Sequence, residues 1–254
     1  MKHAFHIASK DIRTSLSTPV VFAICSAFLV ICGFFFFTLL QQYNLQIQRF
    51  EKLPVHGPNL NDWVVVPFYR SIEITLLFIV PLLGMKVFSE EKQLGTLEIL
   101  IGSAASLGDI VLGKYLAVLF LVSAMLACSF IYPLVLLIFS NPEALPIFVG
   151  FFALLLFSWT ICSVGVLVSS FIKNPIVSGI STLLALLVFY MSNVLTEKLG
   201  AVIGGALNYL SPATHTELAI KGVITGVDLI YFLSVIVGSI FLANRAIESQ
   251  TWRT

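Results

Sequence analysis

Six apolar stretches, each close to the length that crosses a lipid bilayer, constrain the fold of this 254-residue chain more than any other feature. A transmembrane helix needs about 20 mostly apolar residues, and its backbone polar groups must bond within the helix itself. We therefore predict an all-α integral membrane protein, with one transmembrane domain covering residues 1–254. The predicted spans are residues 19–40, 72–88, 110–139, 147–172, 176–195 and 229–243.

The overall composition excludes a soluble, secreted or disordered protein. Hydrophobic residues make up 58% of the chain and charged residues only 11%, whereas about a quarter of an average soluble domain is charged. The net charge of +1 gives no basic field that would attract nucleic acid. The four cysteines all lie in apolar stretches, so we interpret them as small core residues.

The distribution of basic residues predicts the orientation of the chain. An even number of spans places both termini on one side of the membrane. With the N-terminus inside, nine of the 14 lysines and arginines fall on the cytoplasmic side and five outside. Because cytoplasmic flanks carry an excess of these residues, the bias favours an N-in, C-in arrangement.

Residues 1–18 precede the first span and have a helical pattern. Phe5, Ala8, Ile12 and Leu16 recur at helical spacing, with charged residues elsewhere on the wheel. This pattern favours an amphipathic helix lying in the plane of the cytoplasmic interface. The alternative is a polar tail that frays.

The connection from Ser89 to Asp109 carries the densest acidic run of the protein. Glu90, Glu91 and Glu98 accompany a short apolar stripe with the spacing of one helix, and Ser106 with Asp109 forms a capping-box pattern that opens the third span. We predict one short amphipathic helix that docks a partner. The alternative is a solvated loop that only links two spans.

The connection from Thr196 to Val227 is long and weakly charged. An apolar stripe over 199–210 is broken by Ser211 and Pro212, and a second short apolar stretch follows. Such a pattern predicts two short re-entrant or interfacial helices on the outer side, before the sixth span.

No enzymatic constellation is recognisable in the sequence. The string Gly108 to Tyr115 starts like a phosphate-binding loop, but Tyr115 stands where that motif needs Ser or Thr, so we interpret Lys114 as a lysine snorkelling to the inner interface. The scattered histidines fit structural or interfacial roles better than metal binding, and we expect no catalytic or metal site.

Glu73 and Asp228 are the ionisable residues nearest to the predicted spans. Both lie close to outer ends of spans, where capping is the expected role. A midplane charge is typical of ion-coupled carriers, and none is predicted here. The energy for any transport would then come from outside the chain.

Two strings resemble a known family. The run Phe88-Ser-Glu-Glu-Lys-Gln-Leu-Gly-Thr-Leu-Glu-Ile-Leu100, followed by Leu112-Gly-Lys114, is similar to the signature of ABC-2 type transporter permeases. The string Leu210-Ser-Pro-Ala-Thr-His215 resembles the gliding-motility GldF branch of that family. The resemblance covers the whole chain, although Thr225 stands where that branch has an acid.

The resemblance implies the permease subunit of an ATP-driven transporter, with an exporter as the expected direction, in the bacterial inner membrane. The chain itself would bind no cofactor, since ATP and Mg would bind to separate ABC ATPase subunits. The other implied partners are a second permease chain in a homodimer or heterodimer, an auxiliary periplasmic-domain protein and membrane lipids, with no nucleic acid. The alternative is a membrane scaffold of an ATPase-driven motility or assembly machine that transports no substrate.

The resemblance also assigns residues to two sites. A cytoplasmic coupling helix would dock the ATPase through Glu90, Glu91, Gly95, Thr96, Leu97 and Glu98. External gate helices would include Leu199, Val202, Ile203, Leu207, Leu210, Ser211 and Pro212.

Overall fold

The computed structural model describes residues 2–50, 59–102, 106–140, 142–193 and 201–251 of the chain. Over these ranges the protein is helical and contains no strand. Six of its helical runs are long and apolar enough to cross a membrane. The prediction of an all-α protein with six spans is confirmed.

The described residues form twelve α-helices, one π-helical turn, η1, and a 3₁₀ turn at residues 191–193. In chain order the elements are α1 (Lys2–Leu16), α2 (Pro19–Phe50), η1 (Asn61–Val65), α3 (Val66–Gly84), α4 (Ser89–Leu94), α5 (Leu97–Ile101), α6 (Leu107–Ser129), α7 (Ile131–Ser140), α8 (Ala144–Ser169), α9 (Pro175–Tyr190), α10 (Ala201–Leu210), α11 (Pro212–Ile220) and α12 (Gly226–Thr251).

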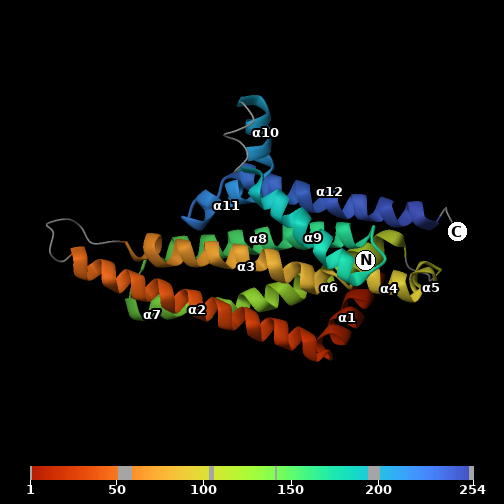
Figure 1. Cartoon of the computed structure of the whole chain (residues 1–254), viewed down its shortest axis with the longest axis horizontal. Helices are drawn as coiled ribbons and strands as arrows, with labels where there is room; N and C mark the ends of the chain where they lie inside the picture. The colour runs from red at the N-terminus through yellow and green to blue at the C-terminus, as the bar shows by residue number, and fades with distance from the viewer. Residues whose placement is uncertain (1, 51–58, 103–105, 141, 194–200, 252–254) are drawn as a thin grey trace.

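Helix α8 is the centre of the bundle. It packs against α3, α6, α9, α11 and α12, with α12 on one side of the α3–α8 pair and α2 on the other (Figure 1). Close approach is possible because small residues occur along α8. At Gly150, a β-carbon would lie only 2.6 Å from the ring of Tyr69. By contrast, α2, α9 and α12 leave large apolar side chains exposed, as helices that face lipid do.

Both ends of the described chain lie at the same end of the bundle. Helix α1, the last turn of α12 and the short helices α4 and α5 gather there (Figure 1). This agrees with an even number of spans. That this end is cytoplasmic stays a prediction from the charge bias.

Helix α1 confirms the helical pattern near the N-terminus, and its place in the plane of the interface stays a prediction. Ala4 and Ala8 are buried against α6, whereas Phe5 is 75% exposed and Leu16 is exposed as well. The helix therefore packs on the bundle through small residues. Its bulky apolar side chains remain free for the lipid interface.

The second span begins earlier than predicted. Its helical run starts at Asn61 rather than at residue 72. The first span, α2, likewise ends later than predicted, at Phe50 rather than near residue 40. The apolar pattern missed the first turns because they contain polar residues with partners. For example, the Asn61 amide donates to the Glu143 carbonyl at 3.2 Å.

The third and sixth spans also differ from the prediction. The third is divided into α6 and α7 near Phe130, because Pro133 has no N–H to continue the helical bonding across the junction. The sixth continues past residue 243 to Thr251, where charged residues extend the helix beyond the apolar stretch. The fourth and fifth spans match α8 and α9 within five residues.

The four cysteines are free thiols. Cys32 and Cys162 are buried, as predicted for core residues, and Cys25 is half-buried. Cys128 is exposed, so the prediction is wrong at that position.

Candidate functional site

The acidic connection after α3 forms two short helices rather than the single helix that we predicted. Gly95 separates α4 from α5 and has a positive φ of 70°. In this left-handed conformation, which glycine adopts without penalty, its N–H bonds the Glu91 carbonyl and closes α4. The stripe of Leu94, Leu97 and Ile101 has the spacing of one helix, and the left-handed turn breaks it.

The capping box at the start of α6 is confirmed. The Ser106 hydroxyl accepts from the Asp109 N–H at 3.2 Å, and it donates to the Asp109 carboxylate at 3.0 Å. Ser106 has an extended backbone, as an N-cap residue should.

Lys114 on α6 is the centre of an ion-pair network at this end of the bundle. Its Nζ lies 2.8 Å from Glu91 Oε1 on α4 and 3.4 Å from Asp11 Oδ2 on α1, and 5.3 Å from the centre of the Phe88 ring. Its side chain is only 4% exposed. The interpretation of Lys114 as a snorkelling lysine is therefore wrong, because α1 and α4 cover it.

Helix α4 is also attached to the end of α8. The Phe88 N–H donates to the Ser169 hydroxyl at 3.2 Å, and the Lys92 ammonium donates to the Ser170 carbonyl. Together with the Lys114 network, these bonds connect α4 to α6, α1 and α8. A displacement of α4 would thus act on three helices at once.

The residues predicted to dock an ATPase divide into two groups. Glu90, Gly95, Thr96 and Glu98 are exposed. Glu91 points inward to Lys114, and Leu97 is buried in the core. The sequence pattern could not separate them, because it does not show that Glu91 faces Lys114 of α6.

On the opposite side of the predicted membrane, two short helices joined at Ser211 confirm the expected pair. The Ser211 hydroxyl is buried and donates to the Tyr190 carbonyl at 2.7 Å. Pro212 is buried as well, Leu207 is half-buried, and Leu210 is exposed. Leu199 and the side chains of Val202 and Ile203 lie outside the described residues.

A buried cluster centred on His215 fixes α11 against α12. The imidazole stacks on the Tyr231 ring with centroids 3.8 Å apart. Its Nδ1 lies 2.8 Å from Asp228 Oδ1 and its Nε2 lies 3.0 Å from the Tyr209 carbonyl. A structural histidine is confirmed here. Its pairing with Asp228 had no signal in the sequence.

Asp228 caps α12, as predicted. Its Oδ2 accepts from both the N–H and the hydroxyl of Thr225, at 3.2 and 2.7 Å, and the Thr225 hydroxyl accepts from the Asp228 N–H at 3.4 Å. This is a reciprocal capping box, in which Thr225 is the N-cap.

Glu73 does not cap an outer helix end, contrary to our expectation. It lies twelve residues inside the run that starts at Asn61 and is fully buried. Its Oε2 lies 3.1 Å from Arg70 and 3.3 Å from the Tyr190 hydroxyl on α9. The Arg70 guanidinium also donates to the Ala213 carbonyl on α11, at 3.4 Å. Arg70 and Glu73 thereby tie α3 to α9 and α11.

Within the described ranges, no group of three or more His, Cys, Asp and Glu side chains is placed to hold a metal ion.

The spans and the two sites define a multi-pass membrane protein whose short accessory helices lie at both ends of the bundle. Residues 5–244 match the family model described as ABC-2 family transporter protein. The chain therefore belongs to the ABC-2 transporter family. Membership identifies a membrane permease subunit of an ABC transporter and implies an ABC ATPase as a partner. No curated protein matches the sequence.

Proposed function

We propose that the chain is the permease subunit of an ATP-driven exporter, and that α4 and α5 receive the ATPase. The observation that carries the proposal is the contact of Lys114 with Glu91 and Asp11, which ties α4 to α6 and α1. A docking helix must pass force to spanning helices. Charge-assisted hydrogen bonds are about twice as strong as neutral ones, so this network can link α4 firmly to α6 and α1.

The two groups of docking residues have different proposed roles. Glu90, Thr96 and Glu98 are exposed and contact basic or polar groups of the ATPase, while Gly95 sets the turn that presents them. Glu91 and Leu97 instead fix the two short helices to the bundle. This refines the prediction that all six residues touch the partner.

The run from Asn61 to Leu94 offers a mechanical path to the outer gate. Its last turns form α4, and nearer its other end Arg70 bonds to α11. ATPase movement at α4 would thus reach α11 and α10. The gate residues remain Leu199, Val202, Ile203, Leu207, Leu210, Ser211 and Pro212, of which Ser211 holds the joint of the pair against α9.

The remaining parts of the assembly follow from the family resemblance. Two permease chains form the transport pathway, and ATP and Mg bind to the ATPase subunits. The complex lies in the bacterial inner membrane. The resemblance of the Leu210 to His215 string to the gliding-motility branch supports an auxiliary periplasmic-domain protein as a further partner.

Docking is tested by co-purification of tagged permease with its ATPase. The Glu90→Lys/Glu98→Lys variant should lose the ATPase, because it reverses both exposed charges without touching the Lys114 network. The matched control is Glu217→Lys, a reversal of an exposed glutamate on α11. Retention of the ATPase by the double variant would show that α4 and α5 are not the docking surface.

Transport is tested separately from docking. In liposomes that hold the intact complex, fractions that contain the transported substrate should stimulate ATP hydrolysis. A cysteine cross-link between the two copies of α10 should block that transport. Hydrolysis that no cell fraction stimulates would favour the alternative, a scaffold for ATPase-driven motility or assembly.

A further inference from the structure

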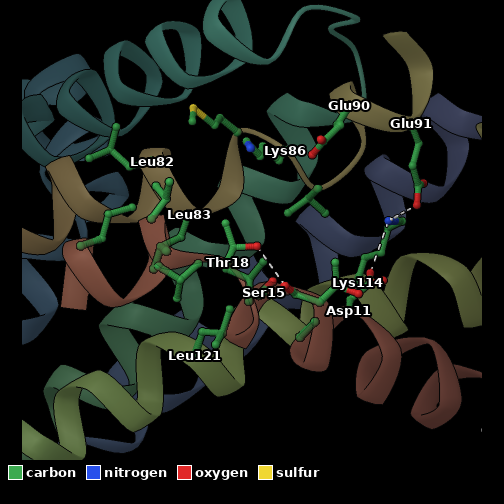
Figure 2. A pocket seen from close by; sticks show the side chains of 18 of the residues that line it. Asp11, Ser15, Thr18, Leu82, Leu83, Lys86, Glu90, Glu91, Lys114 and Leu121 are labelled. Carbon is green, nitrogen blue, oxygen red and sulfur yellow. Dashed lines mark hydrogen bonds and ion pairs between the residues drawn. The ribbon is translucent and has the colours of Figure 1, made fainter. Parts of the chain in front are cut away.

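A cavity of about 350 Å³ lies where α1, the start of α2, the end of α3, α4 and α6 meet. Its lining is divided by polarity. Charged side chains lie at one end, beside the Lys114 network, and Leu82, Leu83 and Leu121 lie at the other (Figure 2). A cavity of this kind suits an amphiphile better than water or a wholly apolar ligand.

The charges at the polar end balance. The lining contains three lysines and three carboxylates: Lys10, Lys86, Lys114, Asp11, Glu90 and Glu91. Lys114 pairs with Asp11 and Glu91. The other three form no ion pair with any residue that the structure describes. Unpaired charges of both signs therefore face one neutral cavity.

One acceptor at this end has no hydrogen-bond partner among the described residues. Glu91 Oε1 bonds Lys114, but Glu91 Oε2 is buried and unsatisfied. A buried charged acceptor without a partner is unfavourable, because it has lost its water and gained no hydrogen bond. A ligand that brings an ammonium group would satisfy this oxygen.

The apolar end continues onto the outer surface of the bundle. Val20 and Leu82 line the cavity and are about half exposed, at 54% and 48%. On a spanning helix such side chains face acyl chains. A hydrocarbon tail can therefore pass from the cavity into the bilayer without crossing a polar barrier.

We propose that this cavity binds one zwitterionic aminophospholipid, of the phosphatidylethanolamine class, from the cytoplasmic leaflet. The phosphate contacts Lys10 and Lys86, the ammonium contacts Glu91 Oε2, and an acyl chain runs along Leu83 toward Val20. A zwitterion keeps the site neutral, whereas an anionic lipid would leave it with an excess negative charge. The bound lipid connects α1 to α4, which is one of the two docking helices.

The test measures lipid that remains on the intact complex. The complex is purified from membranes that contain phosphatidylethanolamine and phosphatidylglycerol, and retained lipids are counted by native mass spectrometry. The variants are Lys86→Glu, which reverses a phosphate contact, and Thr14→Trp, which fills the cavity from an exposed position on α1. The matched control is Lys173→Glu, an exposed lysine between α8 and α9 that does not line the cavity.

The proposal expects about one phosphatidylethanolamine per permease chain. Lys86→Glu should lower its retention about tenfold, since a lost hydrogen bond to a charged group corresponds to a tenfold change in affinity. Thr14→Trp should also lower it, and Lys173→Glu should not. Each variant should have the melting temperature of the wild type, which would show that its fold is intact.

Three results would overturn the proposal: equal or greater retention of phosphatidylglycerol, no retained lipid, or retention that neither cavity variant changes. Any of these could occur while the ATPase still co-purifies. Failure of the lipid site is therefore separate from failure of the docking proposal.

Discussion

Gly113 on α6 lies so close to Ala4 on α1 that no side chain fits between the two helices. A β-carbon at Gly113 would stand 2.7 Å from the Ala4 carbonyl oxygen and 2.9 Å from Ile7 Cβ. The glycine before Lys114 thus lets α1 approach α6 closely. Lys114, its neighbour in sequence, then bonds Asp11, which lies seven residues beyond Ala4 on α1.

The close approach predicts opposite effects for two similar substitutions on one helix. Gly113→Ala should destabilise the protein by about 1–3 kcal/mol, because the added methyl group displaces α1. Gly108→Ala has nothing within 4 Å of the new β-carbon and should be neutral or stabilising by up to about 1 kcal/mol, since alanine favours a helix. Thermal unfolding in detergent measures both. Equal melting temperatures for the two variants would contradict this packing.

Removal of the Lys114 charge should loosen α1 and α4 together. Lys114→Met leaves Asp11 and Glu91 without their common partner, and we expect a loss of about 1–3 kcal/mol, because both carboxylates are partly exposed and regain some water. Limited proteolysis should cut near α1 faster in this variant. Arg13→Met is the control, because it removes a cation of α1 that forms no ion pair among the described residues and does not line the cavity. Equal digestion of the two would show that the network does not hold α1.

For the Arg70–Glu73 pair we predict that one variant loses stability and that a second variant recovers it. Arg70→Met leaves the fully buried Glu73 carboxylate without its cation and should cost about 3 kcal/mol. Arg70→Met/Glu73→Leu should recover much of that loss, because no buried charge remains. Arg245→Met breaks an exposed pair with Glu248 and should change stability by less than about 1 kcal/mol. A double variant that is less stable than Arg70→Met would contradict the assignment.

These residues also show what the sequence could and could not predict. Apolar length was sufficient to find six spans, since the bilayer leaves few other ways to bury such segments. The depth of Glu73 and the burial of Lys114 were not predictable. Their partners include Tyr190, which is 117 residues away, and Asp11, which is 103 residues away. A local pattern gives such residues a surface role by default.

Local signals succeeded where the contacts themselves are local. Ser106 with Asp109, and Thr225 with Asp228 at the start of α12, form capping bonds within one helical turn. The division of the docking segment at Gly95 was equally local, but the apolar spacing outweighed the glycine in our interpretation. The exposed positions there depend on which side chains face Lys114 and the core, and no local pattern contains that information.

The cluster at the start of α12 should be sensitive to Asp228. Asp228→Ala removes the bonds to Thr225 and leaves the buried His215 without its acid partner, so we expect a loss of about 2–3 kcal/mol. Glu217→Ala, on the exposed side of α11, should change stability by less than about 1 kcal/mol. Protease sensitivity between α11 and α12 gives a second measure. An unchanged Asp228→Ala variant would mean that the stack on Tyr231 alone holds His215.

The two glycines of the docking segment should respond differently to alanine: Gly95 lies in the turn between α4 and α5, and Gly102 lies at the end of α5. Gly95 has a φ of 70° and open space around a new β-carbon, so Gly95→Ala should cost about 1–2 kcal/mol through the backbone alone. Gly102 ends α5 with a φ of −70°, which alanine adopts freely, so Gly102→Ala should not destabilise the protein. If the turn presents Glu90 and Glu98 to the ATPase, Gly95→Ala should also weaken co-purification, whereas Gly102→Ala should not. Equal co-purification of a measurably destabilised Gly95→Ala variant would show that the angle between α4 and α5 does not matter for docking.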